Sequence, residues 1–138
     1  MVITKKIKLK TKGSTDIIDI TSEVASALSS TKLKKGILTV FVSGSTGGLT
    51  TVEYEPGLVE DLKVFFEKII PEKAAYQHNI RWNDGNGYGH VRASLLGPSI
   101  AVPFTDGSMM LGTWQQIIFI DFDNRPRSRE LVVQIVGE

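Results

Sequence analysis

The last forty residues of the chain alternate between extended apolar runs and short polar turns. Residues 99–104 precede a Thr105-Asp106-Gly107 turn, residues 114–122 precede a polar turn at 123–128, and residues 130–136 form the last run. An Asp-Gly pair between two extended runs is typical of a β-hairpin. This part of the chain therefore favours antiparallel strands joined by tight turns over a regular alternation of strand and helix.

The preceding part of the chain mixes strands and helices in no regular order. Residues 37–42 (ILTVFV) predict a strand buried on both faces, because they are apolar and rich in β-branched side chains. Residues 56–70 carry apolar side chains at helical spacing, and Pro71 ends the pattern. The other predicted elements are strands at 3–10, 16–20 and 49–54, a helix that begins near Thr21 or Ser22, and a short helix at 90–96. We expect an α+β fold, a mostly antiparallel β-sheet with two or three helices packed on it.

Length and composition narrow the class of protein further. A chain of 138 residues predicts a single domain spanning residues 1–138. It contains no cysteine, so any metal site must use His, Asp, Glu, Asn or backbone oxygen. No apolar run is long enough for a membrane span or the core of a signal peptide, so we expect a cytoplasmic protein without a membrane partner. The net charge of +1 gives no reason to expect nucleic acid as a partner.

Both histidines of the chain fall in one polar, glycine-rich segment, residues 76–90. His78 and His90, with Asp84 and Asn86 between them, could supply two nitrogens and one oxygen to zinc or a similar ion. The alternative is that each imidazole only hydrogen-bonds a loop carbonyl. A spacing of twelve residues matches no common metal-ligand motif, so the residue types alone leave both interpretations open.

A second candidate is the loop that follows the buried strand, residues 43–48. Its consecutive amides, with the hydroxyls of Ser45 and Thr46, could form a nest for phosphate or carboxylate, and Gly44 and Gly47 would allow close approach. The loop lacks the lysine of a phosphate-binding P-loop and leads into a strand rather than a helix. A glycine-rich β-turn without a ligand is the alternative.

Two further groups of polar residues are candidates. Glu53 and Glu55 lie two apart on a predicted strand and face one way, so that one could be a general base or a ligand. Trp114 and Gln115 place a large ring and an amide at the start of a strand, where the ring could line a pocket. Exposed strand carboxylates and core tryptophans are the ordinary alternatives.

Three arginines, Arg125, Arg127 and Arg129, lie in or beside the last predicted turn. They could bind phosphate, but Asp121 and Asp123 lie close enough in the sequence to neutralise their charge. We expect a solvated hairpin turn there.

The chain resembles the YjbQ-like family, often labelled secondary thiamine-phosphate synthase, over almost its whole length. The matching blocks are Leu49-Thr50-Thr51-Val52-Glu53, Asp61-Leu62, Tyr76-Gln77-His78, Asn86-Gly87-Tyr88-Gly89-His90, Arg92-Ala93-Ser94-Leu95-Leu96-Gly97, Leu111-Gly112-Thr113-Trp114-Gln115 and the closing residues 131–138. Many relatives begin the loop after the buried strand with His-Thr, whereas this chain has Gly44-Ser45.

The resemblance implies a compact α+β domain that assembles as a homotrimer, with a polar pocket near a subunit boundary. It also implies one site that contains Glu53, His78, Asn86, His90, Trp114 and Gln115. The activity attached to the family joins a pyrimidine diphosphate to a thiazole phosphate and releases pyrophosphate.

We therefore expect a small-molecule enzyme that acts on a phosphorylated substrate with a divalent metal, zinc or magnesium, held by His78, His90 and Asp84. The expected catalytic residues are Glu53, His78, His90 and Gln115, and the expected substrate-binding residues are Gly44, Ser45, Thr46, Gly47, Asn86 and Trp114. The alternative is a non-catalytic trimeric protein that binds a metal or a phosphorylated metabolite.

Overall fold

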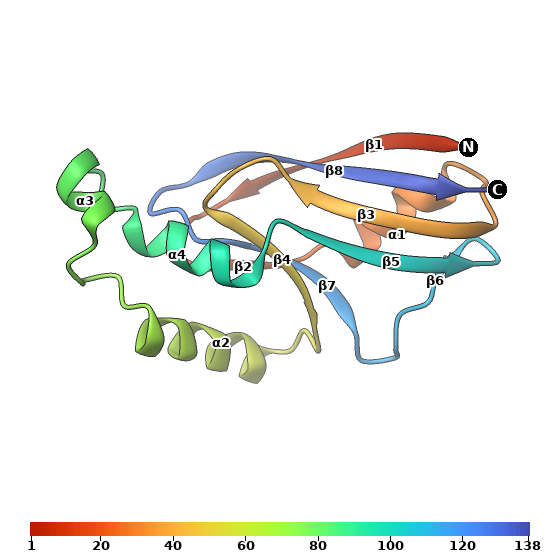
Figure 1. Cartoon of the computed structure of the whole chain (residues 1–138). Helices are drawn as coiled ribbons and strands as arrows, with labels where there is room; N and C mark the ends of the chain where they lie inside the picture. Colours follow the sequence, from red (N-terminus) through yellow and green to blue (C-terminus); the bar gives the residue numbers. More distant parts are fainter.

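The computed structural model describes residues 1–138 and contains two antiparallel sheets and four helices. Figure 1 shows the order of the elements along the chain. They are β1 (Val2–Thr11), β2 (Asp16–Asp19), α1 (Thr21–Ser29), β3 (Lys35–Val42), β4 (Gly47–Val52), α2 (Pro56–Ile69), α3 (Gln77–Trp82), α4 (Gly87–Leu96), β5 (Ser99–Thr105), β6 (Ser108–Met109), β7 (Gln116–Asp121) and β8 (Arg127–Gly137). The α+β, mostly antiparallel fold expected from the sequence is confirmed.

The larger sheet has the strand order β1-β8-β3-β5-β6, and the smaller sheet has the order β2-β7-β4. β8 pairs with β1 on one side and with β3 on the other, so the last strand of the chain lies inside the larger sheet. The two sheets face each other, and α1 packs beside them. Because side chains alternate along a strand, Leu131, Val133 and Ile135 of β8 all point into the space between the layers, where each is fully buried.

The four middle residues of β7, 117–120, are all apolar because this strand is covered on both faces. Ile117 and Phe119 belong to the main core between the sheets. Ile118 and Ile120 point to the other face, where Phe66 of α2 and Ala93 of α4 cover them. Burial on both faces thus explains a run that shows no polar alternation.

α4 is held against the end of α2 by one buried cation, Arg92. Its guanidinium is 2% exposed and donates to the carbonyl of Ile70, to the hydroxyl of Thr15 at 2.7 Å and to the carboxylate of Glu67 at 2.9 Å. This anchoring sets the position of the first turn of α4, which carries His90.

Three predicted boundaries differ from the structure. The strand expected at 49–54 ends at Val52, and the glutamate that follows at 55 caps α2 instead, accepting hydrogen bonds from the amides of Gly57 and Leu58. The strand expected from residue 114 begins at Gln116. The helix expected at 90–96 begins at Gly87, and α3 was not predicted, because none of its side chains is buried and its sequence therefore has no apolar periodicity. No helix of the structure is long and apolar enough to cross a membrane.

Candidate functional site

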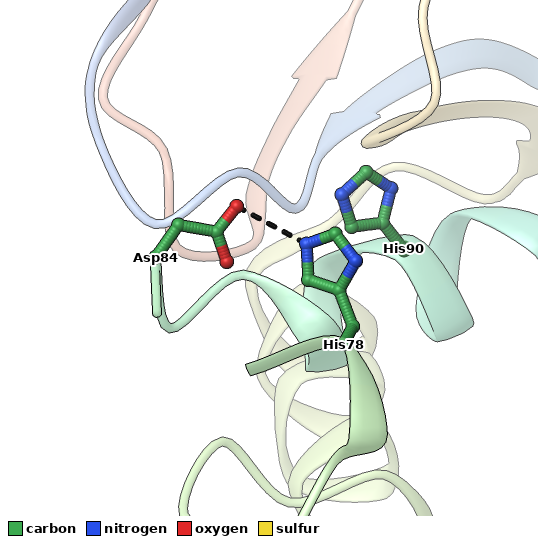
Figure 2. A group of neighbouring side chains, drawn as sticks. All are labelled: His78, Asp84 and His90. Carbon is green, nitrogen blue, oxygen red and sulfur yellow. Dashed lines mark hydrogen bonds and ion pairs between the residues drawn. The ribbon is translucent and has the colours of Figure 1, made fainter. Parts of the chain in front are cut away.

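His78 of α3, Asp84 of the following turn and His90 of α4 lie together (Figure 2). The centroids of the two imidazole rings are 4.4 Å apart, and Nε2 of His78 is 3.1 Å from Oδ2 of Asp84. One potential ligand atom from each residue lies within 4.8 Å of the other two. Both histidines are partly buried and Asp84 is exposed, so the group is open to solvent on one side.

The turn between α3 and α4 places Asp84. Asn83 ends α3 in the left-handed conformation with φ 52°, and Gly85 also has a positive φ, 68°. The reversal allows the amide of Asn86 to donate to Oδ1 of Asp84 at 3.0 Å. This hydrogen bond, together with the one to His78, holds the pKa of the Asp84 carboxyl below its usual range. Asp84 is therefore kept in the anionic form that binds cations.

Close backbone approach brings the two helices together. The amide of Gly87 donates to Oδ1 of Asn79 at 2.8 Å, and a Cβ built at Gly87 would lie 2.5 Å from Cβ of Tyr76. A Cβ at Gly89 would lie 2.7 Å from the carbonyl oxygen of Phe122. Only glycine fits between α4 and its neighbours at these two positions.

His90 connects this helix pair to the loop at residues 43–46. Its Nδ1 lies 3.1 Å from the carbonyl oxygen of Ser45. Because a carbonyl can only accept, Nδ1 carries the proton in this contact, and Nε2 of the neutral ring keeps its lone pair. A backbone carbonyl that orients a histidine in this way is a common feature of metal-binding imidazoles.

The loop and the helix pair border a cavity of about 500 Å³ that has no hydrophobic residue in its lining. The lining residues are Ser43, Gly44, Ser45, Thr46, Asp84, Asn86, His90, Asp123, Asn124, Arg125, Arg127 and Arg129. None of the backbone N–H groups of residues 43–46 donates to an acceptor within the chain. Consecutive N–H groups at the border of the cavity thus have no partner within the chain.

A buried ion pair supports the floor of this cavity. Arg129 donates from Nε and Nη2 to the carboxylate of Asp121 at 2.8 and 2.9 Å, and both residues are buried. Nη2 of Arg129 also donates to Oγ1 of Thr46 at 2.7 Å, and Thr11 donates to Asp121 at 2.6 Å. The expectation of a solvated turn is therefore wrong for Arg129, because its position on β8 points toward the space between the sheets.

Asp123 continues this network toward the histidines. Its Oδ2 accepts hydrogen bonds from Thr46 at 3.0 Å, from Nδ2 of Asn86 at 3.2 Å and from Arg127 at 3.4 Å. Burial alone would raise the pKa of Asp123, but the hydrogen bonds and the Arg127 charge outweigh it, so that the pKa lies below its ordinary value. The backbone N–H of Asn86 donates to Asp84. Hydrogen bonds therefore connect Asp123 with Asp84 and, through it, with His78.

Sequence reasoning did not identify Asp121, Asp123 and Arg129 as supporting residues. The alternation of side chains along β7 could have identified Asp121, because it is two residues after Phe119 and four after Ile117, which both point into the core. A charged side chain at an inward position needs a buried partner of opposite charge.

Three of the expected site residues lie elsewhere in the chain. Glu53 follows the far end of β4, about 20 Å from Gly47 if each strand residue advances about 3.3 Å. Gln115 donates to Oγ1 of Thr51 at 3.1 Å and borders a separate cavity of about 280 Å³. Trp114 is 71% exposed. Within one chain, these three side chains do not share the cavity that contains Asn86, His90 and the 43–46 loop.

Comparison with known proteins gives one family. The family model described as UPF0047 protein YjbQ-like matches residues 5–138. A UPF0047 protein from Methanothermobacter thermautotrophicus is 41% identical over 99% of this chain and 94% of its own length. One from Archaeoglobus fulgidus is 39% identical over 94% of this chain and 98% of its own length.

Solved structures agree with the sequence comparison. The crystal structure of a YbjQ-like protein of unknown function from Sulfolobus solfataricus matches with a TM-score of 0.94 and 30% identity, covering 100% of this chain and 99% of that chain. An uncharacterised YjbQ/UPF0047 protein from Clostridium acetobutylicum matches with a TM-score of 0.88 and 34% identity, covering 96% of this chain and 99% of that chain. The chain therefore belongs to the YjbQ-like UPF0047 family.

Proposed function

We propose that this protein is a metal-dependent enzyme that acts on a phosphorylated small molecule, with a divalent ion held by His78, Asp84 and His90. The observation that carries the proposal is the convergence of these three donor atoms within 4.8 Å at the edge of a wholly polar cavity. A group of this kind beside unused amide donors matches the needs of phosphate chemistry.

The donor set fits zinc better than magnesium. Two imidazole nitrogens and one carboxylate oxygen are ordinary zinc ligands, whereas magnesium prefers oxygen ligands. Neighbouring ligands about 2.1 Å from a tetrahedral zinc lie about 3.4 Å apart, so the ion would replace the 3.1 Å hydrogen bond between His78 and Asp84 and draw together donor atoms that lie within 4.8 Å of one another. Three protein ligands also leave one coordination position for a substrate or water, as in catalytic zinc sites.

The residues of the chain have separable tasks in this proposal. The Ser45 carbonyl keeps the proton of His90 on Nδ1, and the Asn86 amide keeps Asp84 oriented and ionised. The amides of residues 43–46 donate to phosphate oxygens. When bound, the divalent ion would neutralise negative charge on a departing phosphate or pyrophosphate. The thiamine-phosphate synthase-like coupling that the family resemblance implies releases such a leaving group.

The first test is metal content and zinc affinity. Purified protein should bind about one zinc per chain, and His78→Ala and Asp84→Asn should each weaken zinc binding at least about tenfold, as measured by titration calorimetry. Asp106→Asn is the matched control, because Asp106 sits in an exposed turn far from the histidines in the sequence and asparagine tolerates its positive φ. Zinc binding that is unchanged in both site variants would overturn the proposed site.

Turnover separates the enzyme from the alternative, a non-catalytic trimer that binds a metal or a metabolite. Loss of thiamine phosphate formation in His90→Ala and in Glu53→Gln, with folding intact, would support an enzyme. Tight binding of zinc and phosphorylated compounds without any product would support the binding protein. Loss of activity in Glu53→Gln would place Glu53 in a site completed by another subunit, because within one chain it does not border the cavity that contains His90.

The outer face of the larger sheet supports the proposed homotrimer. No helix covers this face (Figure 1), and it carries a row of apolar side chains across three strands. Val2, Val136 and Ile37 are register neighbours there and are 60%, 45% and 45% exposed. Phe41, two pairs further along, is 41% exposed. The polar row of Thr4, Gln134 and Thr39 separates Phe41 from the other three residues. Exposed apolar side chains on an uncovered sheet face are typical of a subunit interface.

A further inference from the structure

Two arginines that border the polar cavity have no role in the proposed metal site. Arg125 lies in the turn before β8, and Arg127 is the first residue of β8. Arg127 and Arg129 are two residues apart on one strand and so face the same way. Asp121 engages Arg129 with two hydrogen bonds, whereas Arg127 makes only one long hydrogen bond, 3.4 Å to Asp123, and lies where the row reaches the cavity.

The acids that line the cavity leave most donors of these two arginines free: Arg127 makes one long ion pair, with Asp123, and the side chain of Arg125 makes none. The cavity contains the carboxylates of Asp84 and Asp123 and the guanidiniums of Arg125, Arg127 and Arg129. Asp84 is already engaged by His78 and by the Asn86 amide. Asp123 accepts from Thr46 and Asn86, and its contact with Arg127 is a single long hydrogen bond of 3.4 Å.

Most guanidinium donors therefore remain available. Arg127 uses only Nη1, and its side chain is 35% exposed. The side chain of Arg125 makes no hydrogen bond or ion pair, and only its backbone N–H contacts Asp123. Residues 43–46 border the same cavity, and their amides also have no acceptor within the chain. The cavity thus has more free donors than a carboxylate with two oxygens can accept.

We propose that Arg125, Arg127 and the amides of residues 43–46 form a subsite for a phosphate group in its dianionic form, a phosphate monoester or inorganic phosphate. The three terminal oxygens of a phosphate can accept from both guanidiniums and from the loop amides at once. His90 and Asp84 border the same cavity, so a phosphate in this subsite lies next to the proposed metal site. The subsite deepens the proposed function, but its binding chemistry does not require the metal.

The experiment uses protein treated with a chelator, so that metal and phosphate binding are measured separately. Nitrogen–proton correlation spectra are recorded while inorganic phosphate, phenyl phosphate or phenylacetate is added. We expect saturable shifts of the amides of residues 43–46 with both phosphates, and at least about tenfold weaker binding of phenylacetate. Tighter binding of phenyl phosphate than of inorganic phosphate would identify an ester as the preferred source of the group.

Variants then assign the arginines. Arg127→Gln and Arg125→Gln should each weaken phosphate binding about tenfold, and Arg127→Lys should retain part of the affinity because lysine keeps the charge but not the fork of donors. Arg81→Gln on α3, outside the cavity lining, is the control and should bind as the wild type does. Dispersed spectra establish that each variant is folded.

The outcomes separate this subsite from the metal proposal. His78→Ala should bind phosphate within about twofold of the wild type in chelator, since the arginines and the loop are unchanged. Phosphate binding without zinc binding would refute the metal site and leave the subsite intact. No saturable shift at residues 43–46, or an affinity that does not change in either glutamine variant, would overturn the subsite even if zinc binds.

Discussion

Arg129 links the buried core to the loop that borders the cavity. It joins Asp121 of β7 to Thr46 of the loop, and it is 9% exposed. Breaking a buried pair by removing one partner leaves an uncompensated charge, which costs more than the pair contributes. The same change frees the loop from its anchor at Thr46.

We therefore expect Arg129→Leu to lower the free energy of unfolding by about 3–5 kcal/mol, because Asp121 would remain buried without its partner. Urea denaturation monitored by circular dichroism measures this loss. Arg125→Leu is the control and should change stability by less than about 0.5 kcal/mol, since Arg125 is exposed and unpaired. Equal losses in the two variants would contradict the account of the buried pair.

The lowered pKa of Asp123 predicts how the free energy of unfolding depends on pH. Its folded pKa lies below the unfolded value of about 3.9, so its contribution to stability is fully present above that value and is lost as the pH falls through the folded pKa. Asp123→Asn should cost about 1–3 kcal/mol near pH 7, because the donors on Thr46, Asn86 and Arg127 lose their charged acceptor.

The measurement is the difference in unfolding free energy between wild type and Asp123→Asn across a pH series. That difference should be constant from pH 7 to about pH 5 and should shrink below about pH 4. A difference that persists undiminished at pH 3 would show that Asp123 acts through shape rather than charge.

At the scale of elements, the approach of α4 to the end of β7 depends on Gly89. A Cβ there would meet the carbonyl oxygen of Phe122 at 2.7 Å, a backbone atom that cannot move aside cheaply. Gly89→Ala should therefore lower the unfolding free energy by about 1–3 kcal/mol despite the higher helix propensity of alanine. It should also weaken zinc binding, because His90 is the next residue.

Gly112→Ala is the matched control for that change. A Cβ at Gly112 would lie 3.7 Å from its nearest neighbour, an ordinary contact, so stability should change by less than about 0.5 kcal/mol. Thermal unfolding of both variants tests the pair, and an unchanged melting temperature in Gly89→Ala would contradict the close approach.

Alternation and helical spacing were sufficient to predict most elements. The spacing of apolar side chains in α2 and β8 directly reflects which face is buried. β3 was predicted as a strand, but its expected burial on both faces is wrong for the single chain, because Ile37 and Phe41 are 45% and 41% exposed. α3 was missed because its residues QHNIRW bury nothing, so its helix is defined by the turn at Asn83 and by tertiary contacts rather than by apolar spacing.

The candidate site was predictable only where its residues are near in sequence. His78 and His90 lie on consecutive helices, and the glycines between them indicated a tight reversal. His90 and Ser45 are far apart in the chain, so their contact depends on how β4 and α4 pack. Periodicity predicts which face of an element a residue lies on, but not which distant segments lie beside it. The sequence therefore could not show that Glu53, Trp114 and Gln115 lie away from the histidines.

At the scale of the whole molecule, the uncovered face of the larger sheet bears on assembly. We expect light scattering after size-exclusion chromatography to give about 46 kDa, three times the chain mass of 15.2 kDa. Phe41→Glu should shift the population toward monomer, because a desolvated charge at an interface costs several kcal/mol.

Val64→Glu on α2 is the control for this prediction. It exchanges another exposed apolar side chain, 59% exposed, for the same acid on a different surface. A trimer that survives Phe41→Glu but dissociates in Val64→Glu would place the interface on α2, and a monomeric wild type would contradict the proposed assembly.

All three proposed metal donors come from one contiguous stretch of thirteen residues, 78–90, whereas the proposed phosphate donors come from two other segments. The two sets of donors lie on separate segments and meet through contacts such as those of His90 with the Ser45 backbone and of Asn86 with Asp123. Side chains that are not part of these contacts can therefore change in one set without altering the other. A relative could carry other side chains in the 78–90 stretch and bind a different ion while it keeps the phosphate donors. It could also differ in the loop while it keeps the metal donors. Such a modular arrangement would let one scaffold diversify its chemistry by replacing single segments instead of rebuilding a site dispersed over the whole chain.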